Sequence, residues 1–170
     1  MGSSLHYFVE CECEKAFIRS YMFADGKHFK LGKIEVFNFI NERLSKAKAR
    51  TINRDMTVAI VFDTDVENVE ILEENIKLLK TVSMLDDKHI IFVPSIKNFE
   101  DELVYSSSKL KTINELFKTQ SVANFKKRFI SHSDIVSKLN DVGFDFELIW
   151  SRNAKTPFNV YKNECSKIKQ

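Results

Sequence analysis

Two groups of carboxylates follow short, mainly apolar segments, and they are the residues of this chain best suited to chemistry. Residues 5–9 lead directly into Glu10, and residues 56–62 lead directly into Asp63 and Asp65. Apolar runs of this length are typical of buried strands. Open α/β sheets build their sites at the carboxyl ends of strands, and carboxylate oxygens suit Mg²⁺ or Mn²⁺. The sequence therefore predicts a hard-cation site and metal-assisted cleavage or transfer of phosphoesters.

This chemistry assigns a role to each acid. Two cations about 4 Å apart can activate a water and stabilise the leaving oxygen of an in-line displacement. We expect Glu10 to be a metal ligand or the general base, and Asp63 and Asp65 to be metal ligands. Glu14 comes one helical turn after Glu10 and should reach the same edge, whereas Glu12 should point elsewhere. The alternative is an acidic loop edge that has no function.

The hydrophobic pattern predicts that strands and helices alternate in the first two thirds of the chain. Strand patterns fall at residues 5–9, 33–39, 56–62 and 89–93, and helical patterns fall at residues 12–23, 40–49 and 66–85. This order is typical of an α/β fold, with a four-stranded, mainly parallel sheet joined by right-handed crossovers. The strand at 56–62 is apolar on both faces and should lie inside the sheet.

The pattern changes after Pro94. Short helices are expected at residues 98–106, 110–117, 122–130 and 132–139, and a last strand is expected at residues 143–150. We therefore divide the chain into an α/β core over residues 1–105 and a basic, mainly helical C-terminal extension over residues 106–170 that ends in this strand. A chain of 170 residues suits one compact domain with a real core.

Charge is distributed unevenly along the chain. Residues 1–106 carry a net charge of −4 and residues 107–170 a net charge of +6, which together make the +2 of the whole chain. A basic half beside an acidic metal site suits a polyanion such as DNA or RNA, and the alternative is a solvated surface. The densest basic run is predicted to bind nucleic acid, with a solvated helix face as its alternative; it comprises Lys126, Lys127 and Arg128.

The sequence lacks the features of several other binding sites and of a membrane or secreted protein. It contains no glycine-rich phosphate loop, so nucleotide hydrolysis is not expected to drive it. Cys11 and Cys13 lack the spacing of a zinc site, and with Cys165 they are expected to be structural thiols. No apolar run approaches the roughly 20 residues that span a bilayer, and no signal peptide is visible. We therefore expect a cytoplasmic protein without a membrane partner.

The acidic motifs resemble those of a known family. Residues 9–17 resemble the opening of a TOPRIM domain, in which a strand ends in Glu-Gly and an acid follows as a helix begins. Residues 61–65 resemble that family's Asp-x-Asp at the end of the third strand. Residues 93–103 are similar to the segment after the fourth strand in OLD-type and RloB-like TOPRIM nucleases. The resemblance covers roughly residues 5–105 and implies a TOPRIM-like, Rossmann-like fold.

The resemblance also implies a function. It implies a nuclease that needs Mg²⁺ or Mn²⁺, cleaves nucleic-acid phosphodiesters and serves bacterial defence against phage or mobile DNA. Its partners would be DNA or RNA and an ATPase or other subunit of a defence system, and it could form homo-oligomers. Glu100 is implied as a further metal ligand, with Glu102 as its competitor. Lys97 would be a catalytic cation beside the developing negative charge, with an ordinary surface lysine as the alternative.

Two other classes of protein have acids at strand ends, but the sequence fits them poorly. Haloacid-dehalogenase-like phosphatases carry Asp-x-Asp on the first strand, whereas here it falls on the third. Receiver domains need an acidic pair at the end of the first strand and a Lys at the end of the fifth, and Glu10 and Glu14 match that pattern poorly. The stronger alternative is a catalytically silent TOPRIM-like module that binds nucleic acid or a partner protein. Cys11 favours it, because the family usually has Gly at this position, where a tight turn lies near the substrate.

Overall fold

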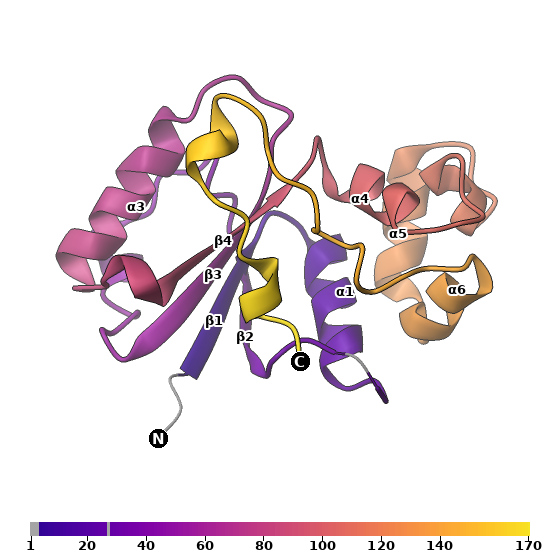
Figure 1. Cartoon of the computed structure of the whole chain (residues 1–170), viewed down its shortest axis with the longest axis horizontal. Helices are drawn as coiled ribbons and strands as arrows, with labels where there is room; N and C mark the ends of the chain where they lie inside the picture. The colour runs from indigo at the N-terminus through magenta and orange to yellow at the C-terminus, as the bar shows by residue number, and fades with distance from the viewer. Residues whose placement is uncertain (1–3, 27) are drawn as a thin grey trace.

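A single four-stranded sheet forms the centre of the molecule. The computed structural model describes residues 4–26 and 28–170. The strands are β1 (Ser4–Val9), β2 (Gly32–Val36), β3 (Met56–Asp63) and β4 (Ile90–Ser95). They lie in the order β2-β1-β3-β4 (Figure 1), and each neighbouring pair is parallel. The expected α/β class is therefore confirmed, and the sheet is parallel throughout.

Strand register brings the carboxyl ends of three strands to one edge. Phe8 of β1 lies opposite Ile60 of β3, so Glu10 comes level with the last residues of β3. Asp63, the last residue of β3, lies opposite Ser95, the last residue of β4. Parallel strands all end at the same edge, and the acids that follow them are neighbours for this reason.

Helices cover both faces of the sheet. The main ones beside it are α1 (Glu12–Met22) and α3 (Glu70–Val82), which lie on opposite sides (Figure 1). Successive strand residues point to opposite faces, so Tyr7 and Val61 pack in the core on the α1 side while Phe8 and Phe62 pack on the α3 side. Both faces are apolar, as a buried parallel sheet requires.

The chain after β4 forms short helices and then returns along the sheet. Its helices are α4 (Phe99–Tyr105), α5 (Val122–Ser131) and α6 (Ile135–Asp141), with single-turn helices η2 (Ile113–Leu116), η3 (Phe158–Val160) and η4 (Cys165–Lys167). The amide of Glu164 donates to the carbonyl of Phe92 at 2.9 Å, so this segment covers the outer edge of β4, which would otherwise present unpaired backbone groups. No helix in the described part of the chain is long and apolar enough to cross a membrane.

Two predicted elements are wrong. Residues 143–150 do not form a strand: they lie mostly in turns, and their strand-like pairing is limited to one isolated bridge between Ser107 and Phe144. Phe146 and Trp150 are buried instead in an aromatic cluster with Phe29, whereas Leu148 is exposed. The alternation fails at its centre, because a strand would place Leu148 on the same face as the buried Phe146 and Trp150.

The predicted helix at residues 40–49 shrinks to α2 (Lys46–Ala49). The side chain of Asn38 accepts hydrogen bonds from the amides of Ile40 and Asn41 at 3.0 and 2.9 Å, which stabilises a turn. Asn75 of α3 then accepts from the amide of Leu44 at 2.7 Å. The other differences are smaller: η1 (Asp87–His89) precedes β4, α3 begins four residues later than expected, and the helix expected at residues 110–117 is the short η2.

Candidate functional site

Glu10 and Asp63 meet at the carboxyl edge of the sheet. Glu10 follows β1, Asp63 ends β3, and these strands are neighbours. The Glu10 carboxylate is hydrogen-bonded to both the side chain and the backbone of Asp63. The exposed Asp65, two residues further on, adds a negative charge that acts on both. The two acidic motifs, 53 residues apart in sequence, thus form one cluster.

The first turn of α1 brings a third carboxylate to the same place. Glu14 is fully buried, and its Oε2 accepts a hydrogen bond of 2.9 Å from the amide of Cys11, the residue that caps the helix. This contact satisfies one of the amides that a helix start leaves free. The charges of Asp63 and Glu10 both act on Glu14. Glu12, by contrast, is exposed and pairs with Lys15 at 3.1 Å.

The cluster holds protons more tightly than isolated acids do. Burial, followed by the charge of Glu10, raises the pKa of Asp63 to about 9. Burial also raises the pKa of Glu10 to about 7, although its hydrogen bond with Asp63 opposes this. Burial and the charge of Asp63 raise the pKa of Glu14. Like charges so close together cannot all ionise, so Glu10 and Asp63 share a proton near neutral pH.

The donor atoms fit the chemistry of a hard cation. Asp63 Oδ1 and Glu14 Oε1 are buried and have no hydrogen-bond partner among the described residues, and a buried polar atom without a partner is costly. Within residues 4–26 and 28–170, however, no group of three or more acids, histidines or cysteines is arranged as a ready metal site. Glu10 and Asp63 contact each other, so a cation would have to replace their shared proton.

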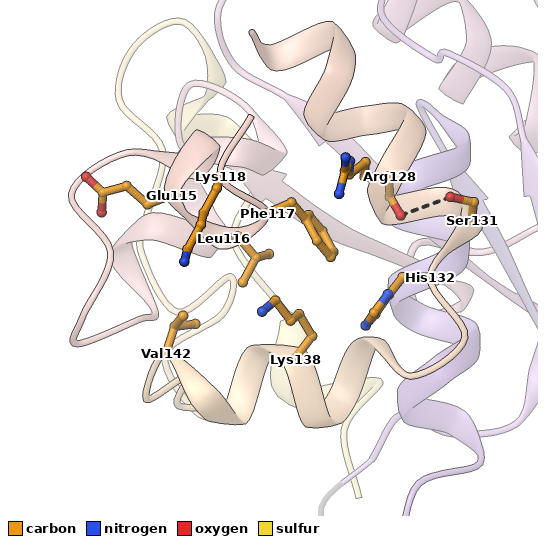
Figure 2. A pocket seen from close by; sticks show the side chains of 9 residues that line it. All are labelled: Glu115, Leu116, Phe117, Lys118, Arg128, Ser131, His132, Lys138 and Val142. Carbon is orange, nitrogen blue, oxygen red and sulfur yellow. Dashed lines mark hydrogen bonds between the residues drawn. The ribbon is translucent and has the colours of Figure 1, made fainter. Parts of the chain in front are cut away.

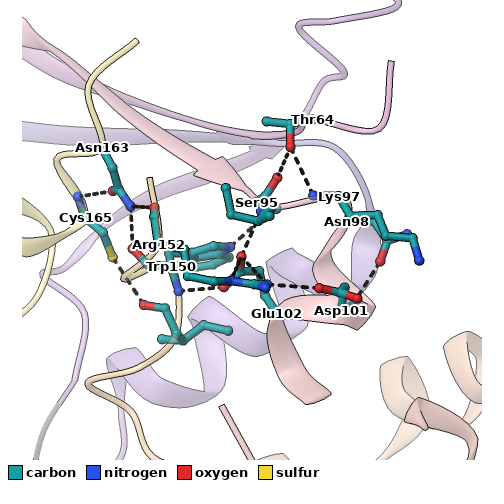
Figure 3. A network of polar contacts seen from close by, with 12 residues as sticks. Thr64, Ser95, Lys97, Asn98, Asp101, Glu102, Trp150, Arg152, Asn163 and Cys165 are labelled. Carbon is teal, nitrogen blue, oxygen red and sulfur yellow. Dashed lines mark hydrogen bonds and ion pairs between the residues drawn. The ribbon is translucent and has the colours of Figure 1, made fainter. Parts of the chain in front are cut away.

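Ser95 is a member of the site that the sequence did not indicate. Its hydroxyl forms a hydrogen bond with Asp63, which favours the ionised form of that acid. Its Oγ also accepts a hydrogen bond of 3.1 Å from Nε1 of Trp150 (Figure 3). The one available signal was position, because Ser95 ends the strand next to β3 and lies opposite Asp63 in register.

Lys97 lies beside Asp65. Its backbone joins Thr64 twice: the Lys97 amide donates to Thr64 Oγ1 and the Thr64 amide donates to the Lys97 carbonyl, both at 3.0 Å. Lys97 has a φ of 71°, in the left-handed region that is uncommon for residues other than Gly. Lys97 and Asp65 line the same hollow of about 340 Å³, together with Lys155 of the C-terminal extension.

Glu100 and Glu102, the two acids of α4 that were considered as metal ligands, bind other partners. Glu102 is fully buried and accepts hydrogen bonds from the amides of Ile96 and Trp150 at 2.8 and 3.1 Å (Figure 3). It also accepts from Nη2 of Arg152 at 2.8 Å. Its role is therefore to hold the C-terminal extension against the core. Glu100 forms an ion pair of 3.0 Å with Lys126, and its charge also acts on Cys13 of α1.

The basic run of α5 does not form one patch. Lys126 faces Glu100, and its carbonyl accepts a weak hydrogen bond of 3.9 Å from Sγ of Cys13. Arg128 lines a different hollow, together with Lys118 and Lys138. Lys127 is exposed. Only Lys126 of this run is thus directed toward the segment next to Glu10, since its charge also acts on Cys11.

Comparison with known proteins does not assign this chain to a family. The TOPRIM resemblance depends on the residues of the two acidic motifs and on the segment after β4, and it stays an expectation. No protein-family model, no curated protein and no solved structure shows a significant match to this chain.

Proposed function

We propose that this chain is a TOPRIM-like, divalent-metal-dependent nuclease that cleaves nucleic-acid phosphodiesters and acts in defence against phage or mobile DNA. The observation that carries the proposal is the cluster of Glu10, Glu14 and Asp63 at one edge of a parallel sheet, in which Glu14 is fully buried and the other two are partly buried. Gathering three carboxylates where one is fully buried and two are partly buried is costly unless a cation or protons neutralise them. Because these acids lie at the edge where parallel sheets form their sites, this cost indicates a role in function rather than in stability.

Each acid of the cluster, and Lys97 beside it, would have a defined role in the proposed reaction. Glu14, Asp63 and Asp65 would hold Mg²⁺ or Mn²⁺, with Glu10 as either a further ligand or the general base; the cation when bound supplies charge neutralisation and a nucleophilic water at neutral pH. A pKa of about 7 suits Glu10 as the general base that accepts the proton of that water. Lys97, at the rim of the hollow beside Asp65, would approach the phosphate oxygens, where negative charge grows during displacement.

A second candidate function is supported by a separate observation. Cys11 has a partly buried side chain at the turn between β1 and α1, and the acids beside it already bind each other. A module that uses these carboxylates only as a proton-sharing structural pair would bind nucleic acid or a partner protein without cleaving it. The two functions differ in whether a divalent cation binds at the carboxylates.

The proposal is tested by a cleavage assay with Mn²⁺ or Mg²⁺ on plasmid DNA, single-stranded DNA and tRNA. The wild type should cut at least one of these substrates, and Asp63→Ala should not. Asp86→Ala is the matched control, because Asp86 is an exposed acid that precedes β4 at the opposite edge of the sheet. It should cut as the wild type does. Absence of both cleavage and metal binding, the latter measured by calorimetry, would overturn the metal site and favour the silent module, whereas metal binding without cleavage of any of these substrates would overturn the nuclease and leave the metal site.

A further inference from the structure

A basic pocket lies in the C-terminal extension, away from the acidic cluster. It has a volume of about 660 Å³ and lies between η2, α5 and α6 (Figure 2). We call it the Phe117 pocket, and the argument uses five of its lining residues, which are Phe117, Lys118, Arg128, His132 and Lys138. Its volume is in the range of small-molecule sites.

Within the described part of the chain, the three cations of the pocket have no counterion. Lys118, Arg128 and Lys138 come from three separate segments, and Figure 2 shows their charged ends directed toward the shared space. Among the described residues, no carboxylate forms an ion pair with any of them. Glu115 is the one acid in the lining, and its carboxylate points outward (Figure 2), where Oε2 accepts a hydrogen bond of 2.9 Å from the amide of Lys111. Three cations gathered without a counterion produce a positive potential that attracts an anion.

The rings of Phe117 and His132 form an aromatic wall of the pocket beside these cations. Phe117 is partly exposed, and the His132 ring packs edge-on against it with ring centres 5.2 Å apart. Nζ of Lys138 lies 5.9 Å from the centre of the Phe117 ring. The pocket thus combines a flat apolar surface with several positive charges. A ligand that matches both has a planar ring system and a phosphate, which is the chemistry of a nucleotide.

The position of the pocket relates it to the acidic cluster. Arg128 and Lys126 are two residues apart on α5, and Lys126 is directed toward Glu100 and the start of α1. His132 also lines a second hollow of about 330 Å³ against α1, together with Lys15 and Arg19. Basic residues therefore continue from the Phe117 pocket along α1, whose first turn carries Glu14, although Glu12 lines the same hollow and pairs with Lys15 at 3.1 Å.

We propose that the Phe117 pocket binds one unpaired nucleotide of a single-stranded nucleic acid, with its base against Phe117 and its phosphates at Lys118, Arg128 and Lys138. A base paired in a duplex is stacked on its neighbours and would have to leave the stack to reach the aromatic wall. Single strands and loops present such bases freely. This proposal rests on the proposed function in one respect only, which is that the bound strand would be the substrate that the acidic cluster cleaves.

The test measures binding of the full-length protein by fluorescence anisotropy in EDTA, where metal-dependent cleavage cannot occur. The probes are labelled 12-nucleotide single strands of DNA and RNA, the corresponding duplexes, AMP as a competitor and a poly-glutamate peptide as a second competitor. We expect at least one single strand to bind 10-fold or more tightly than its duplex. AMP should compete weakly, and the peptide should compete less than an unlabelled strand of equal charge.

Two variants separate stacking from charge. Phe117→Leu keeps an apolar side chain but removes the ring, and it should weaken binding of the single strand by about 5- to 150-fold without changing the salt dependence. The triple change of Lys118, Arg128 and Lys138 to Gln should reduce the slope of log K against log salt by about 2 units. Lys162→Gln is the control, because Lys162 is an exposed lysine of the same extension outside the pocket, and it should bind as the wild type does. Melting curves identify any variant that fails to fold. Phe117→Tyr keeps a ring at this position and should bind the single strand as the wild type does.

Several results would overturn the proposal. Equal binding of duplex and single strand with no effect of Phe117→Leu would show a general basic surface. Competition by AMP as strong as by the strand would show a site for free nucleotides, and stronger competition by the peptide would show an acidic protein partner. Failure of the proposed nuclease is seen separately, since Asp63→Ala removes cleavage and should leave strand binding in EDTA intact.

Discussion

Nε1 of Trp150 donates a hydrogen bond of 3.1 Å to Oγ of Ser95, and both side chains are fully buried. The contact joins the C-terminal extension to the strand end that faces Asp63. Ser95 in turn bonds Asp63 and favours its ionised form. The indole is thus two hydrogen bonds away from the proposed metal ligand, and packing of the extension can influence the proton affinity of the site.

Replacing Ser95 by Ala should weaken both stability and metal binding. The Trp150 Nε1–H loses its acceptor inside the core, which costs about 1–3 kcal/mol of unfolding free energy. Asp63 loses a bond to its ionised form, so its pKa should rise further and its affinity for Mn²⁺ should fall. Urea unfolding and calorimetric titration with Mn²⁺ measure the two effects. Ser107→Ala is the matched control, because this buried hydroxyl bonds only the Leu103 carbonyl, at 2.8 Å, and its loss should leave Mn²⁺ affinity unchanged.

The acidic cluster should make the protein less stable as pH rises. Because the pKa of Asp63 is raised from an ordinary value of 3.8 to about 9, the folded state binds this proton more tightly than the unfolded state. The resulting stabilisation is complete below about pH 4 and is lost progressively as pH rises toward 9. Urea unfolding without metal at several pH values should show this loss, and Asp63→Asn should show a smaller one. An equal pH dependence in both proteins would mean that Asp63 is not the group that holds the proton.

Mn²⁺ should raise the melting temperature more at pH 8 than at pH 6. A cation competes with protons for the same carboxylates, so its apparent affinity grows as those protons leave, and binding to the folded state raises its stability by mass action. The wild type should show this trend in thermal unfolding. Asp63→Asn and Glu14→Gln should show little Mn²⁺ response at either pH, while Asp86→Asn at the opposite edge of the sheet should respond as the wild type does.

Arg152 should be needed for stability and not for metal binding. It bonds the buried Glu102 at 2.8 Å and Asp101 at 3.0 Å, and its guanidinium lies 4.2 Å from the centre of the Tyr105 ring. Arg152→Met leaves Glu102 without its cation in the core, which should cost about 3 kcal/mol or more of unfolding free energy. Arg43→Met, which breaks the exposed pair with Glu74, should change stability very little. Both variants should keep the Mn²⁺ response of the wild type at a temperature where they are folded.

The sequence alone was sufficient to predict the central part of the fold. The apolar runs before Glu10 and Asp63 are strands β1 and β3, because short runs that are apolar on both faces can be buried only inside a sheet covered on both sides. Because strand patterns alternate with helical patterns, the sequence predicted a parallel sheet, and the strands of a parallel sheet all end at one edge. The meeting of Glu10 and Asp63 followed from this local pattern, and so did the position of Glu14 one turn into α1.

Tertiary structure alone decided the remaining features, since they depend on contacts between residues far apart in the chain. Ser95 and Trp150 are separated by 55 residues and Glu102 and Trp150 by 48, and no local pattern shows which buried acid will find a cation or which hydroxyl will face the site. The same holds for residues 143–150, whose alternation looked like a strand until the aromatic core supplied another way to bury it. The Phe117 pocket likewise forms only where three segments of the extension meet. Local periodicity reports which side of a segment is buried, and only the folded chain decides what that side is buried against.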